Sequence, residues 1–573
     1  MVTTDAALAK AREGKSTGAY KGLKSGALGL ISSTVIGVAS TAPAYSLAAT
    51  LVLVVLAVGL QAPVVAVLAF VPMLLISFGY KEMNNADPDC GTVFTWSVRA
   101  FSWPRARSLG PRVGWMGGWG LIAADLLVMA SLSQVAGQYV FFLFGANSIG
   151  ANATSGWVLL VGVGWLVVMT AICYVGIEVS ANLQKVLLGI ELFALTLLSI
   201  FALVKVGNGT APAGHLSPQW AWLNPFHLGF PAFVAGLTLM LFIYWGWDTA
   251  VSVNEETRDA TVTPGRAAVI STIILLLIYF LVIFSAQAFA GVGSHGLGLA
   301  NPAHESDSLS ILGHAIFGTS TFGNVMYRVL ILMVLSSAAA STQTTILPNA
   351  RTTLSMSVYK GLPEVFGRVH RRFLTPSVST VVFGVAALAE YLIFNYASKS
   401  GYLIPDAVTA LGVMIAFYYG MTGIACIVYY WKSLRDDART LWMRGILPGV
   451  GGAIMWAILV YSLYEDWKPS SSFTMWQMGF PPHWKIGGVF IIAVGALLVG
   501  LVLMFIYGAI RPPFFRGEVL NRDTPTLVPD DIGTPVGLFG VEPFDNVPPD
   551  GHGAPVGGPP PEQGTPVAGP PPS

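Results

Sequence analysis

Long apolar stretches separated by short polar connections dominate the sequence. No charged residue occurs from Gly26 to Tyr80, and a helix that crosses a bilayer needs about 20 residues. This stretch therefore predicts two membrane-spanning helices with a turn near residues 61–63. The same pattern predicts ten further spans, at 114–143, 157–177, 183–205, 231–254, 267–291, 323–349, 376–394, 403–430, 445–464 and 486–510. The sequence thus predicts an all-α, polytopic membrane protein with twelve transmembrane helices.

The composition agrees with this reading. Hydrophobic residues make up 54% of the chain and charged residues 10%, whereas soluble domains carry about 25% charged residues. An ordinary soluble enzyme is therefore excluded. Lys and Arg number 30 against 29 Asp and Glu, so the net charge is +1 and the balance indicates no nucleic-acid partner.

The placement of the positive charges predicts the orientation. If the N-terminus is cytoplasmic, nearly all lysines and arginines fall in cytoplasmic segments. The exceptions are Lys205, Arg328, Lys399, Lys468 and Lys485. Because cytoplasmic loops carry an excess of Lys and Arg, we expect a multi-pass protein of the cell membrane with both termini in the cytoplasm.

The chain divides into four parts on this reading. A cytoplasmic N-terminal tail covers residues 1–25, and a ten-helix transporter core covers 26–430, with a first repeat at 26–206 and a second at 231–430. Two additional helices lie within 445–510. The remainder, 517–573, is rich in Pro and Gly and has too little apolar content to pack, so we predict a disordered cytoplasmic tail.

Two spans contain interruptions near their middles. The first span carries IGVASTAP at 36–43, and the sixth carries FIYWGWD at 242–248. Broken helices at corresponding positions of two halves point to a transporter site, so we expect both segments to be non-helical and adjacent at mid-membrane depth. The outer half-helix beginning near Ala42 would offer free N–H groups and a positive dipole end, which suits a carboxylate. The alternatives are a proline kink at Pro43 and a helix-capping role for Asp248.

Buried acids are the main candidates for chemistry, because an ionised side chain inside a membrane span is costly and by default functional. Asp125 in the third span could pair with a cationic group of the substrate. Glu191 in the fifth span and Asp248 in the sixth are candidates for proton coupling, and a hydrogen-bonded structural group is the alternative for each. Glu390 and Asp406 lie nearer the outer ends of their spans, and we expect them to be solvated.

The eighth span carries a polar run, SSAAASTQTT, at 336–345. Its hydroxyl groups could bind Na⁺ beside the first span. Small hydroxyl residues also promote close packing of membrane helices, and we favour this second interpretation.

Several motifs, in order along residues 26–430, resemble the amino acid, polyamine and organocation permease superfamily. They are YKEMNNADPDCGTVFTWSVRAFS followed by Gly114-Trp115, the sixth span followed by Glu255-Glu256-Thr257, and LPNARTTLSMSVYKGLPEVFGRVHRRFLTP. The resemblance implies a five-plus-five inverted repeat with broken helices 1 and 6. The first span departs from the family pattern of Gly-small-Gly, because it has Gly37-Val38-Ala39.

The resemblance also implies roles for individual residues. A substrate carboxylate would meet main-chain N–H groups around Val38 to Thr41, an ammonium group would meet carbonyls near Val35, Phe242 and Trp245, and Phe242 or Tyr244 could close over the ligand. The third helix lines the ligand pocket in this family, and some proton-coupled relatives have a lysine at the place of Glu191. The substrate-binding candidates are Val35, Gly37, Val38, Ala39, Ser40, Thr41, Asp125, Phe242, Tyr244, Trp245 and Gly246.

Together these features predict a secondary transporter that moves an amino acid or related amine by alternating access, with a coupling proton or by exchange. A transceptor that binds the same ligand and signals is one alternative. A membrane-embedded enzyme is another, but the chain has no H-E-x-x-H or G-x-S-x-G motif and no clustered His and Cys ligands. We expect no cofactor, metal or catalytic residue.

Overall fold

The computed structural model describes residues 19–304, 308–397, 401–479, 481–526 and 536–537. The long helices are α2 (Leu30–Ser40), α3 (Pro43–Val58), α4 (Ala62–Ala86), α6 (Leu109–Leu143), α8 (Gly156–Val175), α9 (Ile177–Gly207), α10 (Phe230–Tyr244), α12 (Thr263–Ala290), α14 (Thr321–Val358), α15 (Ser377–Ala397), α16 (Leu403–Tyr430), α18 (Leu447–Asp466) and α19 (Gly488–Ile510). The shorter ones are α5 (Val93–Phe101), α7 (Asn147–Gly150), α11 (Thr249–Ser252), α13 (Ser308–Phe317), α17 (Ala438–Thr440) and α20 (Pro512–Phe515).

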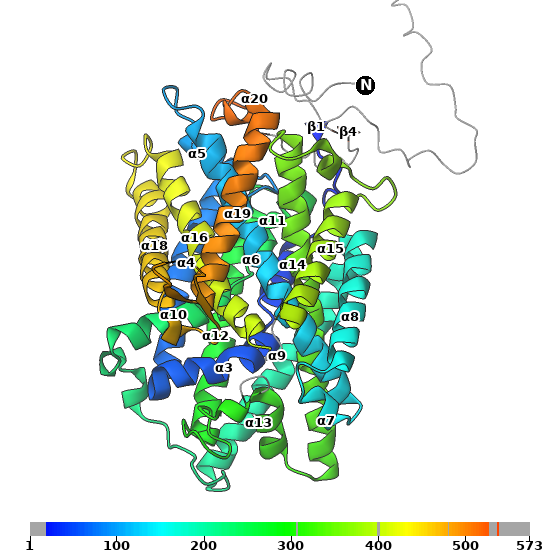
Figure 1. The fold of residues 1–573 in the computed structure, drawn as a ribbon, viewed down its shortest axis with the longest axis vertical. Coiled ribbons are helices and arrows are strands. Elements are labelled where there is room, and N and C mark those ends of the chain that lie inside the picture. Colours follow the sequence, from blue (N-terminus) through cyan, green and yellow to red (C-terminus); the bar gives the residue numbers. More distant parts are fainter. Residues whose placement is uncertain (1–18, 305–307, 398–400, 480, 527–535, 538–573) are drawn as a thin grey trace, which may run out of the picture.

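The four strands are short and lie outside the helical bundle. β1 (Ala19–Tyr20) pairs in parallel with β4 (Val536–Gly537), and β2 (Met475–Gln477) pairs antiparallel with β3 (Lys485–Gly487). Most of the long helices run roughly along one axis (Figure 1), whereas α3 lies across it; α5 and α20 are near one end of the bundle and α7 and α13 near the other. We call these the α5 end and the α13 end.

Helices are the expected structure for apolar segments of this length, because only internally paired backbone is stable within lipid. Eleven segments of the described chain are long and apolar enough to cross a membrane. The first of them, Leu30–Ala86, has 57 residues and contains both α2–α3 and α4. The prediction of a polytopic all-α membrane protein is therefore confirmed, while the number twelve and the inverted repeat stay predictions.

Both predicted helix breaks are present, but they are narrower than the sequence suggested. Residues 36–40 and 242–244 are helical, which corrects our prediction for them. Only Thr41 and Ala42 separate α2 from α3, because Pro43 occupies the first turn of α3, where no backbone donor is needed. The second break covers 245–248, and Gly246 there has a φ of 118°, a conformation that favours glycine.

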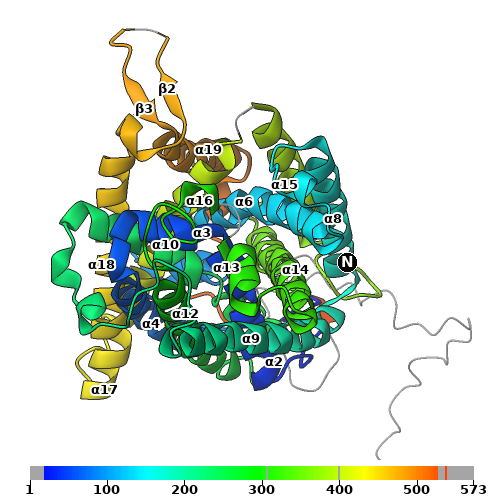
Figure 2. The same cartoon turned by 90° about the horizontal axis from the view of Figure 1, so that it is seen from below.

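The prediction that Glu390 and Asp406 are solvated was wrong, because both side chains are buried. Asp406 accepts hydrogen bonds from the N–H groups of Phe473 and Thr474, at 2.9 and 2.8 Å, and so anchors the segment that leads into β2. The hairpin formed by β2 and β3 projects from the side of the bundle (Figure 2). The position of Asp406 near the end of its span did not reveal that the later segment containing Phe473 and Thr474 covers it.

Residues 517–526 belong to the tail that we predicted to be disordered, and they are among the residues that the structure describes. Residues 511–526 follow α19 at the α5 end, and we call them the C-terminal strap. Phe514 and Leu520 of the strap are buried against Phe94 and Tyr359. The part of the predicted tail up to residue 526 therefore packs on the bundle, and most of the tail beyond it lies outside the described residues.

Candidate functional site

The two helix breaks lie against each other. The Ser40 hydroxyl is 2.9 Å from the Thr249 hydroxyl, and a Cβ added at Gly246 would be 2.9 Å from the carbonyl carbon of Ser40. Such close approach is possible only because residue 246 lacks a side chain. The sequence-predicted candidates Ser40, Thr41, Trp245 and Gly246 are thus brought together at one place in the bundle.

A carboxyl group from α9 occupies the start of α3. Glu191 Oε1 accepts a hydrogen bond from the Ala44 N–H at 2.7 Å and another from the Ser337 hydroxyl at 2.7 Å. Ser337 Oγ also accepts the Tyr45 N–H at 3.2 Å. Glu191 is 1% exposed, and its Oε2 atom has no hydrogen-bond partner among the described residues. A carboxyl at this position is favoured by the dipole of α3.

The N–H groups of the first break are also paired within the chain. Thr41 donates to the carbonyl of Val38 at 3.2 Å, and Ala42 donates to that of Ala39 at 3.1 Å. Val38, Ala39 and Ser40 lie within α2. The donors that we assigned to a substrate carboxylate are therefore engaged in this conformation, and their assignment stays a prediction.

Two other candidates from the first span, Val35 and Gly37, lie within α2 before the break. Gly37 packs closely on α12, since an added Cβ would be 2.6 Å from Ser271 Oγ. Val35 is only partly buried. The structure therefore gives Gly37 a packing contact and leaves the proposed role of Val35 as a prediction.

A pair of tyrosines holds the carboxyl of Asp248. Tyr419 donates to Asp248 Oδ1 at 2.9 Å and Tyr418 donates to Oδ2 at 3.1 Å, while Trp245 Nε1 donates to the Tyr418 hydroxyl. The Asp248 side chain makes no capping hydrogen bond to α11. Neither tyrosine was predicted from the sequence, although two adjacent tyrosines in the apolar α16 indicate a polar contact inside the bundle.

Asp125 lies nearby on α6. It is 3% exposed, it lies beside Asn349 of α14, and it interacts electrostatically with Asp248. Its Oδ2 atom has no hydrogen-bond partner within the described part of the chain. Nor does any described Lys, Arg or His form an ion pair with Asp125, Glu191 or Asp248. A buried carboxyl oxygen without a donor is costly, so Asp125 and Glu191 are candidates for binding a proton or a cation.

The aromatic candidates separate into two positions. Phe242 packs edge-on against Tyr45, with ring centroids 6.3 Å apart, and the Tyr45 hydroxyl donates to Ser131 at 2.8 Å. Tyr244 instead packs against Tyr279 of α12. Ser131 also lines a cavity of about 240 Å³ between α3, α6 and α16, which lies toward the α13 end from the breaks. Phe242 is therefore the better placed of the two proposed aromatic gates.

The α5 end is closed by buried ion pairs. Lys21 Nζ lies 2.7 Å from Asp89 Oδ2 and 2.6 Å from Glu255 Oε1. Burial alone would lower the pKa of Lys21, but these two carboxylates raise it above its usual value. Arg351 forms a two-pronged pair with Glu256 at 2.5 and 2.9 Å. The pairs tie the N-terminal segment, the α4–α5 connection and α14 to η4 (Asn254–Glu256), which follows α11.

A further buried pair joins this closure to the C-terminal strap. Arg99 of α5 lies 2.6 Å from Asp87 Oδ2 and is 3% exposed. Its guanidinium also donates to the backbone carbonyls of Thr524 and Pro525. The connection between α4 and α5 is thus bound by both ends of the described chain.

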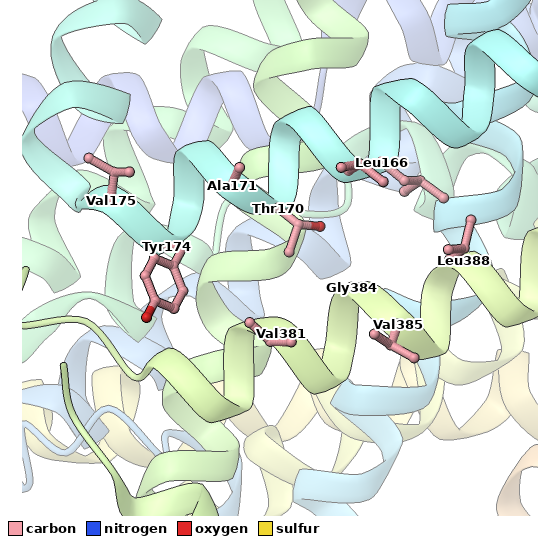
Figure 3. A pocket seen from close by; sticks show the side chains of 10 residues that line it. Leu166, Thr170, Ala171, Tyr174, Val175, Val381, Gly384, Val385 and Leu388 are labelled. Carbon is pink, nitrogen blue, oxygen red and sulfur yellow. The ribbon is translucent and has the colours of Figure 1, made fainter.

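A larger cavity lies elsewhere, in the groove between α8 and α15. It has a volume of about 400 Å³, and Figure 3 shows Thr170, Tyr174, Gly384 and their apolar neighbours lining it. The lining contains two hydroxyl side chains and no charged group. This groove offers little to a polar substrate, so we place the functional site at the helix breaks.

A membrane-spanning bundle with two broken helices that meet beside buried acids defines a membrane transport protein. The amino acid permease family matches residues 26–509, and the chain belongs to this family. Family membership settles the choice between a transporter and a membrane-embedded enzyme, and confirms the resemblance seen in the sequence.

The individual relatives share only a minority of their residues with this chain. An uncharacterized transporter of Mycobacterium tuberculosis is 29% identical over 49% of this chain and 57% of its own length. The branched-chain amino acid permease BcaP of Bacillus subtilis is 22% identical over 77% of this chain and 84% of its own. The low-affinity putrescine importer PlaP of Escherichia coli is 21% identical, over 68% and 79%.

Proposed function

We propose that this protein is a secondary transporter that moves an amino acid or related amine across the cell membrane by alternating access. The observation that carries the proposal is the contact between two helix breaks beside three buried acids, which gives a polar site within an apolar bundle. BcaP and PlaP, whose names specify amino acid and amine substrates, support this class of substrate.

The three acids receive distinct roles in this proposal. Asp125 binds the ammonium group of the substrate, because its Oδ2 atom has no partner and an opposite charge would stabilise it. Glu191 is the coupling group that binds and releases a proton, and Asp248 is the second proton-coupling candidate. The α5 end faces the cytoplasm, as the distribution of Lys and Arg favours.

The remaining candidates complete the proposed site. Main-chain atoms of the two breaks surround the substrate, and Phe242 closes over it toward the α13 end. The proposed lining comprises Val35, Gly37, Val38, Ala39, Ser40, Thr41, Tyr244, Trp245 and Gly246 in addition to Asp125 and Phe242.

Substitution of Asp125 tests the proposal. Asp125→Asn keeps the size of the side chain and removes its charge, so binding of amines should weaken by about tenfold to a hundredfold, the usual range for a hydrogen bond to a charged group. Neutral analogues of similar shape should be affected much less. The measurement is competition for uptake in proteoliposomes, and equal losses for both classes of ligand would contradict the role of Asp125.

A further inference from the structure

We infer that the preferred substrates are amines without a carboxylate group. The inference deepens the proposed function and rests on it, since it narrows the substrate class of the same site. It depends on which hydrogen-bonding groups of the site are occupied and which are not.

A buried carboxylate of a substrate needs donors, and the start of a half-helix is the natural place for it. Here the protein itself fills that place on α3, because Glu191 and Ser337 accept the Ala44 and Tyr45 N–H groups. The donors just before it, on Thr41 and Ala42, are paired with carbonyls of α2. An anionic ligand would find no free N–H group there and would lie close to the carboxyl of Glu191.

The second break gives the same result by a separate route. Asp248 stands at the start of α11, and its two carboxyl oxygens accept hydrogen bonds from Tyr418 and Tyr419. An acidic side chain of the protein is therefore already present at each of the two helix breaks. In its ionised form, each would repel a substrate carboxylate, since like charges in a buried site interact strongly.

The Asp125 carboxyl, in contrast, favours a positively charged ligand. Asp125 Oδ2, which we assign to the ammonium group of the substrate, is a buried carboxyl oxygen without a donor among the described residues. Along the described chain, the buried cations Lys21, Arg99 and Arg351 are all engaged at the α5 end. The unpartnered donors at the second break, Trp247 Nε1 and the Tyr244 hydroxyl, are neutral. Among the described residues the site thus lacks positive charge, which an alkylammonium or diammonium ligand supplies and a carboxylate does not.

Pairs of compounds that differ only by the carboxylate test the inference directly. Suitable pairs are putrescine and ornithine, cadaverine and lysine, and 3-methylbutylamine and leucine. Dissociation constants for the purified protein would be measured by calorimetry. We expect the amine of the preferred pair to bind at least about tenfold more tightly than its amino acid, which corresponds to about 1.4 kcal/mol.

Two variants of Glu191 identify the cause of the preference. Glu191→Ala vacates the Ala44 N–H and removes the charge, so it should reduce the discrimination against the amino acid. Glu191→Gln removes the charge but keeps an oxygen that can accept the N–H group, so it should reduce the discrimination less. Thr196→Ala is the matched control, because Thr196 lies on the same helix and bonds only the Leu192 carbonyl.

The outcomes are distinct. The inference is supported if the amines bind more tightly than their amino acids and if Glu191→Ala reduces this difference. Equal or tighter binding of the amino acids overturns it and leaves the proposed function standing. Absence of binding by both classes overturns the proposed function itself, and an amine preference that Glu191→Ala leaves unchanged overturns the assignment to the start of α3.

Discussion

Glu191 shows how one side chain can combine a structural and a functional role. Its Oε1 atom completes the hydrogen bonding at the start of α3, while its Oε2 atom is left without a partner. A proton on Oε2 would therefore change the charge of the site without breaking the contact to the helix. Coupling requires only that the two orientations of the transporter differ in affinity for this proton.

The substitution Glu191→Gln separates these roles. Glutamine keeps an oxygen for the Ala44 N–H and cannot change its charge, so amine binding and exchange should persist. Accumulation driven by a pH gradient should fall to that of protein-free liposomes. The check is uptake with and without an imposed gradient, and continued pH-driven concentration of substrate would show that the proton travels elsewhere.

Lys21 is one of the buried cations that close the α5 end, and it is shared by two carboxylates. Replacing it by Met leaves Asp89 and Glu255 buried without their shared cation, which typically costs about 3–5 kcal/mol. Lys21→Met should therefore lower the thermal midpoint of the detergent-solubilised protein. Lys24→Met is the control, because Lys24 is exposed, and an equal effect of the two substitutions would contradict the importance of the buried cluster.

At the scale of elements, the two broken helices act as one unit, because the second break packs on the backbone of the first. Gly246 makes this possible through both its missing side chain and its positive φ. The contact lets a movement of either half-helix be transmitted to the other.

The substitution Gly246→Ala tests this contact. The added methyl group would overlap the Ser40 carbonyl, and the φ of 118° is strained for alanine, with a typical cost of about 1–3 kcal/mol. Transport should fall by about tenfold or more while the protein still reaches the membrane. Gly164→Ala on α8 has open space around its Cβ and serves as the control, and normal transport in Gly246→Ala would contradict the coupling.

At the scale of the whole molecule, the sequence predicted what depends on local pattern. Hydrophobic length located the spans, and Gly246 and Pro43 located the breaks. The partners of the buried groups were not predictable, because they lie far apart along the chain. Lys21 and Glu255 are separated by 234 positions, and nothing in either local sequence specifies the other.

Truncation tests whether the C-terminal strap belongs to the folded protein. Removal of residues 538–573 keeps β4 and its pairing with β1, so it should leave the thermal midpoint unchanged. Removal of 511–573 exposes the surfaces that Phe514 and Leu520 cover, each worth about 1.5–3 kcal/mol when fully buried, and deprives Arg99 of its carbonyl partners. The midpoint should then fall by several degrees, and equal midpoints for the two truncations would contradict a stabilising role.

The strap also has a consequence for the order in which the protein is completed during synthesis. Arg99 and Asp87 emerge from the ribosome early, but the carbonyls of Thr524 and Pro525 that complete the surroundings of Arg99 are made only after α19. Chains generally fold from the N-terminus during synthesis. The α5 end therefore cannot reach its final packing until the last transmembrane helix has been inserted. Until then, the contacts that close this end of the nascent chain are incomplete.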